Sequence, residues 1–164
     1  MDRLHATKQI IELVVQAQDI ALQVGLPNIL QPGLVKEMII ADILGHEVIS
    51  SKRDADACDP NDHATKFEYL SCYEGGTGQL DRMFRSPPEK RAESLLRITR
   101  NKSIYLAIFY KTRPLSVKVI YELPPARVAT ETERQLDRSR NAISHVGFSE
   151  NWAAMHGTVV YQAK

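Results

Sequence analysis

The chain has 164 residues, of which 43% are hydrophobic and 25% are charged, and its formal net charge is +1. This composition excludes disordered and fibrous proteins, and the length suits one domain with a single core. No apolar run approaches the roughly 20 residues that cross a bilayer, and the first residues lack a signal-peptide pattern. Two cysteines are too few for a disulfide framework. We therefore expect one domain over residues 1–164, a cytoplasmic location and no membrane partner.

Two amphipathic helices are predicted at the start of the chain. Apolar residues recur at helical spacing from Leu4 to Val24, and Gly25 and Pro27 end the pattern. The apolar stripe is broad, so it predicts either docking onto the core of the same chain or pairing with a second subunit. A second helix is predicted from Leu34 to Leu44, ending at Gly45.

An acidic turn then leads into a strand that carries a carboxylate at its centre. A short strand at His46–Ser50 precedes the turn, and side chains alternate along the next strand, Thr65–Tyr73, with Glu68 in its middle. Carboxylates on two adjacent segments can hold one or two Mg²⁺ ions beside a phosphodiester. The alternative is a solvated hairpin followed by an edge strand. The acids of the turn are Asp54, Asp56 and Asp59.

A glycine-rich stretch, 74–79, follows the strand. No Lys-Ser/Thr signature comes after it, which excludes a nucleotide-binding loop, so its glycines indicate a tight turn or close backbone approach to a ligand. Beyond it we expect a helix at Glu89–Arg97 and a hairpin of strands Ile104–Tyr110 and Leu115–Leu123. Residues 126–141 show little apolar periodicity and predict a solvated helix or loop, and a final strand follows Gly157.

Other groups of residues allow competing interpretations. Cys58, His63 and Cys72 lack a C-x-x-C pair and match a zinc site poorly. A nucleophile made of Cys72 or Ser71, with His63 or His156 as its base, is left open by the sequence. The stretch from 82 to 102 is basic, and its cations form either a solvated face or phosphate contacts. They are Arg82, Arg85, Lys90, Arg91, Arg97, Arg100 and Lys102.

The order of these segments resembles that of the type II restriction endonucleases of the PD-(D/E)XK nuclease superfamily. The resemblance extends over nearly the whole chain and rests on short matches in the same order. They are Gln18–Leu22, Asn28–Gln31, Asp56–Asp59, Phe67-Glu68, Ile104–Tyr110, Val119–Leu123 and Met155–Thr158 with Tyr161.

The resemblance implies an α/β fold with a central mixed sheet flanked by helices. It also implies a homodimer that binds a palindromic duplex and hydrolyses one phosphodiester in each DNA strand with Mg²⁺. Asp56 and Glu68 would bind the metal together with the backbone carbonyl of Tyr69. The segment Gly75–Arg85 would contact bases. Its candidate DNA-binding residues are Gln79, Asp81, Arg82 and Arg85.

One departure from the family is specific. The residue two positions after the glutamate is usually lysine, but here it is Leu70. Lys66 shares the strand face of Glu68 and is one candidate catalytic substitute, and Glu37 could instead complete a more acidic two-metal site. The departure also keeps two other functions open: a catalytically weak or inactive DNA-binding protein of the same fold, and an RNA-directed nuclease.

Overall fold

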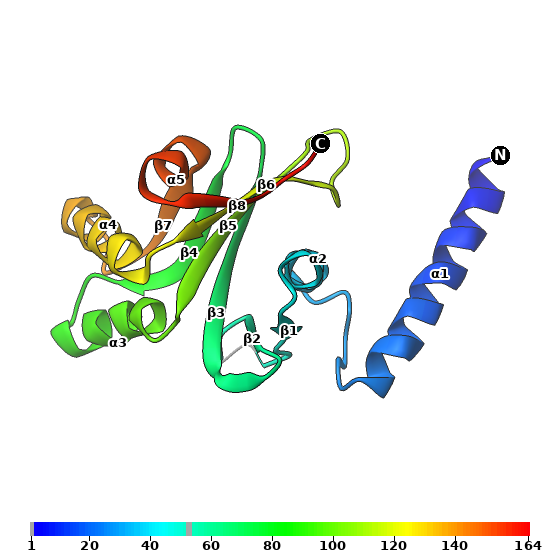
Figure 1. Ribbon diagram of the computed structural model, residues 1–164, viewed down its shortest axis with the longest axis horizontal. Coiled ribbons are helices and arrows are strands. Elements are labelled where there is room, and N and C mark those ends of the chain that lie inside the picture. The colour runs from blue at the N-terminus through cyan, green and yellow to red at the C-terminus, as the bar shows by residue number, and fades with distance from the viewer. Residues whose placement is uncertain (1, 52–53) are drawn as a thin grey trace.

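The computed structural model describes residues 2–51 and 54–164 and has an α/β fold (Figure 1). Its helices are α1 (Arg3–Gln23), α2 (Leu34–Leu44), α3 (Pro88–Thr99), α4 (Pro125–Arg138) and α5 (Glu150–His156). Its strands are β1 (Glu47–Val48), β2 (Ala57–Asp59), β3 (Asp62–Tyr73), β4 (Thr77–Phe84), β5 (Ser103–Phe109), β6 (Val117–Leu123), β7 (Ile143–Ser149) and β8 (Thr158–Gln162). Among the described helices, none is long and apolar enough to cross a membrane.

The central sheet is mixed and lies between helices, as the sequence predicted. Its strand order is β1-β2-β3-β5-β6-β8, with β3 and β5 parallel and the other neighbours antiparallel. Helix α2 covers one face, while α3, α4 and α5 lie on the other (Figure 1). The parallel pair needs a long crossover, and β4 and α3 provide it. β4 also pairs with β7 in a separate antiparallel ribbon.

Alternation along β3 divides its side chains between two cores. Phe67 and Tyr69 pack toward α2, whereas Leu70 and Cys72 join the core formed with the ribbon, α3 and α4. Successive strand residues point to opposite faces, so Glu68 lies on the face of Leu70. The sequence prediction that these two residues share a face therefore agrees with the packing.

Several elements differ from the sequence predictions. β2 lies within the stretch expected to be an acidic turn, β4 replaces much of the expected glycine-rich loop, and β7 and α5 were not predicted. The segment expected to be a solvated helix or loop is α4, which is anchored by a stripe at four-residue spacing. Its buried residues are Val128, Thr132 and Leu136.

Helix α1 stands apart from the sheet (Figure 1). Within the described residues, Ala21 is the only buried member of α1. Leu4, Leu13 and Ile20 are each more than 60% exposed. Of the two arrangements that the sequence predicted, docking onto the core of the same chain is therefore absent from the described structure.

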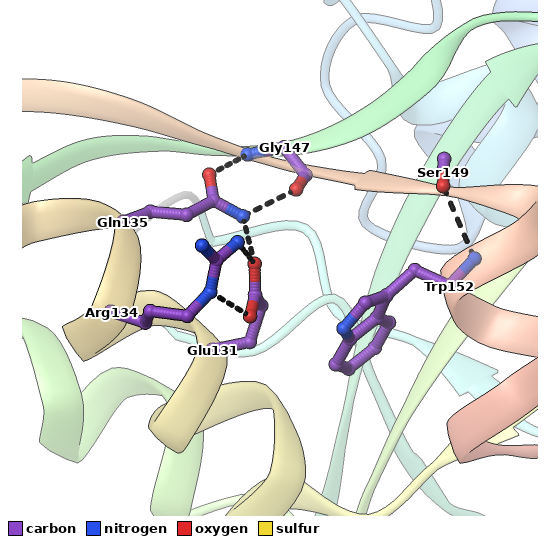
Figure 2. Close-up of polar contacts among 6 residues, drawn as sticks. All are labelled: Glu131, Arg134, Gln135, Gly147, Ser149 and Trp152. Atoms are coloured by element: carbon purple, nitrogen blue, oxygen red, sulfur yellow. Dashed lines mark hydrogen bonds and ion pairs between the residues drawn. The ribbon is translucent and has the colours of Figure 1, made fainter. Parts of the chain in front are cut away.

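The side chain of Gln135 on α4 contacts both backbone groups of Gly147 on β7 (Figure 2). Nε2 of Gln135 donates to the carbonyl oxygen of Gly147 at 2.8 Å, and the N–H of Gly147 donates to Oε1 of Gln135 at 3.1 Å. Glu131 accepts from Gln135 and from the guanidinium of Arg134. Gly147 lies opposite Gln79 of β4, so this contact fixes the ribbon at a candidate DNA-binding residue.

Candidate functional site

Asp56 and Glu68 line one cavity of about 860 Å³. Its walls come from α2, β3, β4, α3 and the segment before β2, which are distant in sequence. The charged residues of the wall are the acids Glu37, Asp54, Asp56, Glu68 and Asp81 and the bases Arg82, Arg97 and Arg100. This mixture of acids and bases can bind a cation and an anion side by side, as a metal-assisted phosphoryl reaction requires.

The register between β2 and β3 explains why the two acids meet. Ala57 lies opposite Phe67 in this antiparallel pair, so one further step places Asp56 beside Glu68. The N–H of Tyr69 then donates to Oδ2 of Asp56 at 2.7 Å. The N–H and C=O of a strand residue point toward the same strand edge, so the Tyr69 carbonyl faces the side on which Asp56 lies.

Both carboxyl groups have raised pKa values. Burial raises the pKa of Asp56 to about 6, against the Tyr69 hydrogen bond and the charges of Arg97 and Arg100. Burial, followed by the charge of Asp56, raises the pKa of Glu68 to about 8. The two acids therefore disfavour each other's ionised form, and a bound cation would relieve this repulsion.

The donor chemistry of the pair fits Mg²⁺. This ion prefers oxygen ligands and is commonly held by one or two carboxylates, with waters and substrate phosphates completing its shell. Asp56, Glu68 and the Tyr69 carbonyl are such a set. Among the described residues, no group of three or more His, Cys, Asp or Glu side chains forms a complete metal cluster, and a two-carboxylate site does not require one.

The two predicted substitutes for the lysine lie in different surroundings. Glu37, in the first turn of α2, lines the cavity, and its charge contributes to the raised pKa of Glu68. Lys66 instead forms an ion pair with Asp54, with Nζ 3.2 Å from Oδ2. Its charge is thus directed to the rim of the cavity.

Leu70 is buried because β4 passes directly over it. A Cβ atom added to Gly78 would lie 2.9 Å from Cβ of Leu70 and 2.5 Å from Cδ1 of Leu106. Glycine is therefore required for this close approach. The sequence predicted a tight turn or close backbone approach to a ligand for this stretch, whereas at Gly78 the group approached is the core of the protein.

A second cavity of about 440 Å³ is also lined by Asp56 and Glu68. Three of the four predicted DNA-binding residues line one or both of these cavities: Gln79, Asp81 and Arg82. The ladder to β7 is irregular between Leu80 and Met83, and Arg82 has φ 53°. A bulge of this kind turns side chains away from the regular alternation. Arg85 lies beyond it, exposed, with its N–H donating to the carbonyl oxygen of Ala142.

The ribbon also contributes His145, which the sequence did not single out. Its Nδ1 lies 2.7 Å from Oδ1 of Asp81, and both side chains are largely exposed. The strand β7 was not predicted, so nothing in the sequence placed His145 opposite β4. The ribbon consequently presents a row of exposed polar groups next to the carboxylates.

Arg97 and Arg100 were predicted only as members of a basic stretch. α3 brings both to the cavity wall, and their charges lower the pKa values of Asp56 and Glu68 against the effect of burial. Arg97 ends the predicted helix Glu89–Arg97 and Arg100 lies three residues beyond it, outside that prediction. The packing of that helix against β4 was not predictable from spacing alone.

The possible thiol and zinc chemistry is not assembled among the described residues. Burial raises the pKa of both Cys58 and Cys72, and neither forms a disulfide. His63 lies 3.3 Å from Glu47, and the ring of His156 lies against that of Trp152. Glu47 also lies opposite Cys58 in the β1–β2 pair, but the contacts of His63 and His156 among the described residues are with Glu47 and Trp152 and not with Cys72.

Neither the protein-family models nor the curated proteins compared with this chain give a match. The chemistry of the site is therefore argued from its own residues.

Proposed function

We propose that the protein is a type II restriction endonuclease that uses Mg²⁺ to hydrolyse phosphodiesters of double-stranded DNA at a palindromic site. The observation that carries this proposal is the pairing of Asp56 with Glu68 in a cavity that also contains Arg82, Arg97 and Arg100. Acids alone would repel a phosphate, and bases alone would only bind it. Their combination supports hydrolysis.

The residues of the chain have distinct roles in the proposed reaction. Asp56, Glu68 and the Tyr69 carbonyl hold Mg²⁺, which when bound polarises the phosphate and lowers the pKa of a bound water. The Tyr69 N–H fixes the orientation of the Asp56 carboxylate. The arginines of the wall bind phosphate oxygens and bring the scissile bond to the acids.

The β4–β7 ribbon supports the proposal of sequence reading. A two-stranded ribbon fits the major groove of B-DNA. Gln79 can pair with adenine and Arg82 with guanine, while Asp81 accepts from cytosine or orients Arg82. Oδ1 of Asp81 also lies 2.7 Å from Nδ1 of His145. Arg85, further along the chain, is assigned to the DNA backbone.

The exposed apolar surface of α1 supports a homodimer with double-stranded DNA as its ligand. Apolar residues cover most of the helix circumference and remain exposed in the described chain. A two-fold dimer would match the symmetry of a palindromic site. A second copy of α1 is the simplest apolar partner for this surface.

One observation favours a second function, that of a catalytically weak or inactive DNA-binding protein. Leu70 is 3% exposed and belongs to the core, so it supplies no charge at the position where the family has lysine. Under this alternative the ribbon and the arginines bind DNA, but the protein hydrolyses the phosphodiester slowly or not at all.

Plasmid cleavage separates these functions. Supercoiled plasmid DNA is incubated with the protein and Mg²⁺ or Mn²⁺, and the fragment ends are mapped. Discrete fragments that are absent with Asp56→Asn support the endonuclease. A mobility shift without cleavage supports the binding protein, and selective degradation of RNA in a parallel reaction indicates a ribonuclease.

A further inference from the structure

Leu70 and Lys66 on β3 and Arg97 on α3 are three positions beside the proposed reaction, and Arg82 and Arg100 also line the cavity. The first, Leu70, is enclosed by Gly78 and has no charge. The second, Lys66, is paired with Asp54. The third is Arg97 of α3. It lines both cavities that contain Asp56 and Glu68.

The guanidinium of Arg97 is held in place by β4. Its Nη1 donates to the carbonyl oxygen of Asp81 at 3.1 Å and lies 3.7 Å from Sδ of Met83. A guanidinium has five N–H donors, and the contacts recorded for the described residues use only Nη1. The anchor therefore restricts the side chain while donors remain for a second, anionic acceptor.

The charge of Arg97 acts on both carboxyl groups. It lowers the pKa of Asp56 and of Glu68, as Arg100 also does. Arg97 differs from Arg100 because it lines the second cavity as well, together with Gln79 of the ribbon. A phosphate placed between the carboxylates and the ribbon would thus meet the guanidinium of Arg97.

We infer that Arg97 contacts the scissile phosphate and provides the positive charge that Leu70 does not, an assignment that rests on the proposed nuclease function. A water oxygen forms a bond to phosphorus while the bond from phosphorus to the bridging oxygen breaks with its electron pair. The water loses a proton to solvent, and the leaving oxygen gains one from solvent. Arg97 stabilises the charge that gathers on the non-bridging oxygens.

Arginine suits this role in a way that lysine on β3 would not. Its guanidinium stays protonated throughout the neutral range and offers planar, paired donors that match phosphate oxygens. It therefore acts through charge and hydrogen bonds and does not remove a proton from the water. Sequence spacing could not identify it, because it comes from α3, which is part of the crossover between β3 and β5 and reaches the cavity through packing.

The test compares Arg97→Gln, which keeps an N–H donor for the Asp81 carbonyl, with Arg97→Lys, which keeps the charge. Arg91→Ala is the control, since it removes a guanidinium of α3 that pairs with Glu133 and Asp137 of α4. Supercoiled plasmid cleavage is measured with protein in excess and Mg²⁺ present. Affinity is measured by mobility shift on a fragment of the same plasmid with Ca²⁺ in place of Mg²⁺.

We expect Arg97→Gln to lower the cleavage rate about 100-fold or more and to weaken DNA binding by less than about 5-fold. Arg97→Lys should retain an intermediate rate and Arg91→Ala the wild-type rate. A wild-type rate for Arg97→Gln, or equal losses of rate and affinity, would overturn the assignment of Arg97 but leave the proposed nuclease function standing. So would thermal melts that show both Arg97 variants unfolded, which would make the residue structural. A wild-type protein that binds but cuts no plasmid overturns the proposed nuclease function and this assignment together.

Discussion

The backbone N–H of Tyr69 donates a hydrogen bond to the Asp56 carboxylate, and the N···O distance is 2.7 Å. This contact joins the segment before β2 to the middle of β3 at the point where Glu68 faces the cavity. A single hydrogen bond thus fixes one proposed metal ligand, Asp56, relative to the other, Glu68, which directly precedes Tyr69 in the chain. Cleavage is consequently expected to be sensitive to small changes in Asp56, including Asp56→Asn, which keeps the shape of the side chain.

The first prediction concerns stability against pH in the absence of metal. Burial raises the pKa of Asp56 to about 6 and that of Glu68 to about 8. Between pH 4 and these values the folded protein binds more protons than the unfolded chain, so the free energy of unfolding falls as the pH rises. Glu68→Gln removes a charge that disfavours folding.

In EDTA at pH 8.5, we expect Glu68→Gln to be more stable than the wild type by about 1 kcal/mol or more, with a smaller difference at pH 5. Urea unfolding at the two pH values measures this. Glu12→Gln, which changes an exposed acid of α1, should behave as the wild type. A wild type that gains stability from pH 5 to 8.5 would contradict the prediction.

The second prediction concerns metal binding without any DNA. A ligand that binds only the folded state raises the midpoint of thermal unfolding. Mg²⁺ should therefore raise the melting temperature of the wild type at pH 8 but leave Asp56→Asn and Glu68→Gln unchanged. The same three proteins in EDTA provide the baseline, and equal shifts in all of them would place the metal elsewhere.

The third prediction compares the two candidate substitutes for the lysine. Glu37 lines the cavity, so Glu37→Gln should lower the cleavage rate by about 10-fold or more by weakening the acidic site. Lys66 pairs with Asp54, so Lys66→Ala should stay within about threefold of the wild-type rate. Single-turnover cleavage and a mobility shift are measured for both. A larger loss of rate for Lys66→Ala, with DNA binding kept, would assign the catalytic role to Lys66.

The fourth prediction tests sequence reading by Arg82. Arg82 lies in the bulge with a backbone φ of 53°, and it lines the cavity. A bidentate contact with guanine favours that base over the others by about 1–3 kcal/mol. Arg82→Ala should therefore relax the preference for one base position, as measured by cleavage of a library of sites. Arg85→Ala should weaken binding to all sequences alike. If Arg82→Ala shows that same uniform loss, then Arg82 contacts phosphate.

The fifth prediction concerns assembly through α1. Leu13 and Ile20 are both more than 60% exposed on the apolar side of the helix. Sedimentation should show a dimer of the wild type without DNA, and Leu13→Glu with Ile20→Glu should give a monomer because charges cannot be buried in an apolar interface. Glu12→Lys, on the polar side of the helix with Lys8 and Asp19, should remain dimeric. A wild type that is monomeric at micromolar concentration rules the interface out.

Strong local patterns made part of the fold predictable. α2 lies at the predicted residues, and β5 and β6 form the predicted antiparallel pair. The ribbon was missed because Gly78 and the irregularity between Leu80 and Met83 interrupt the alternation of β4. α5 has seven residues, which is too short for a clear helical period.

Only the part of the candidate site that depends on local sequence could be predicted. Asp56 and Glu68 are joined by a short connection, so their proximity could be inferred from the strand and turn between them. Arg97 and His145 reach the site through the packing of α3 and through pairing of β7 with a distant strand. Such non-local contacts have no signature in a single sequence. For this reason the sequence predicted the arginines of the cavity only as members of a basic stretch.

The contact between Gln135 and Gly147 affects how the protein behaves toward its own copies. β7 pairs with β4 along one edge, and Gln135 satisfies both backbone groups of Gly147 along the other. An open strand edge is a template for intermolecular strand addition and aggregation. Gln135 blocks that addition at the centre of β7, so the ribbon can project polar groups toward a ligand without recruiting another strand.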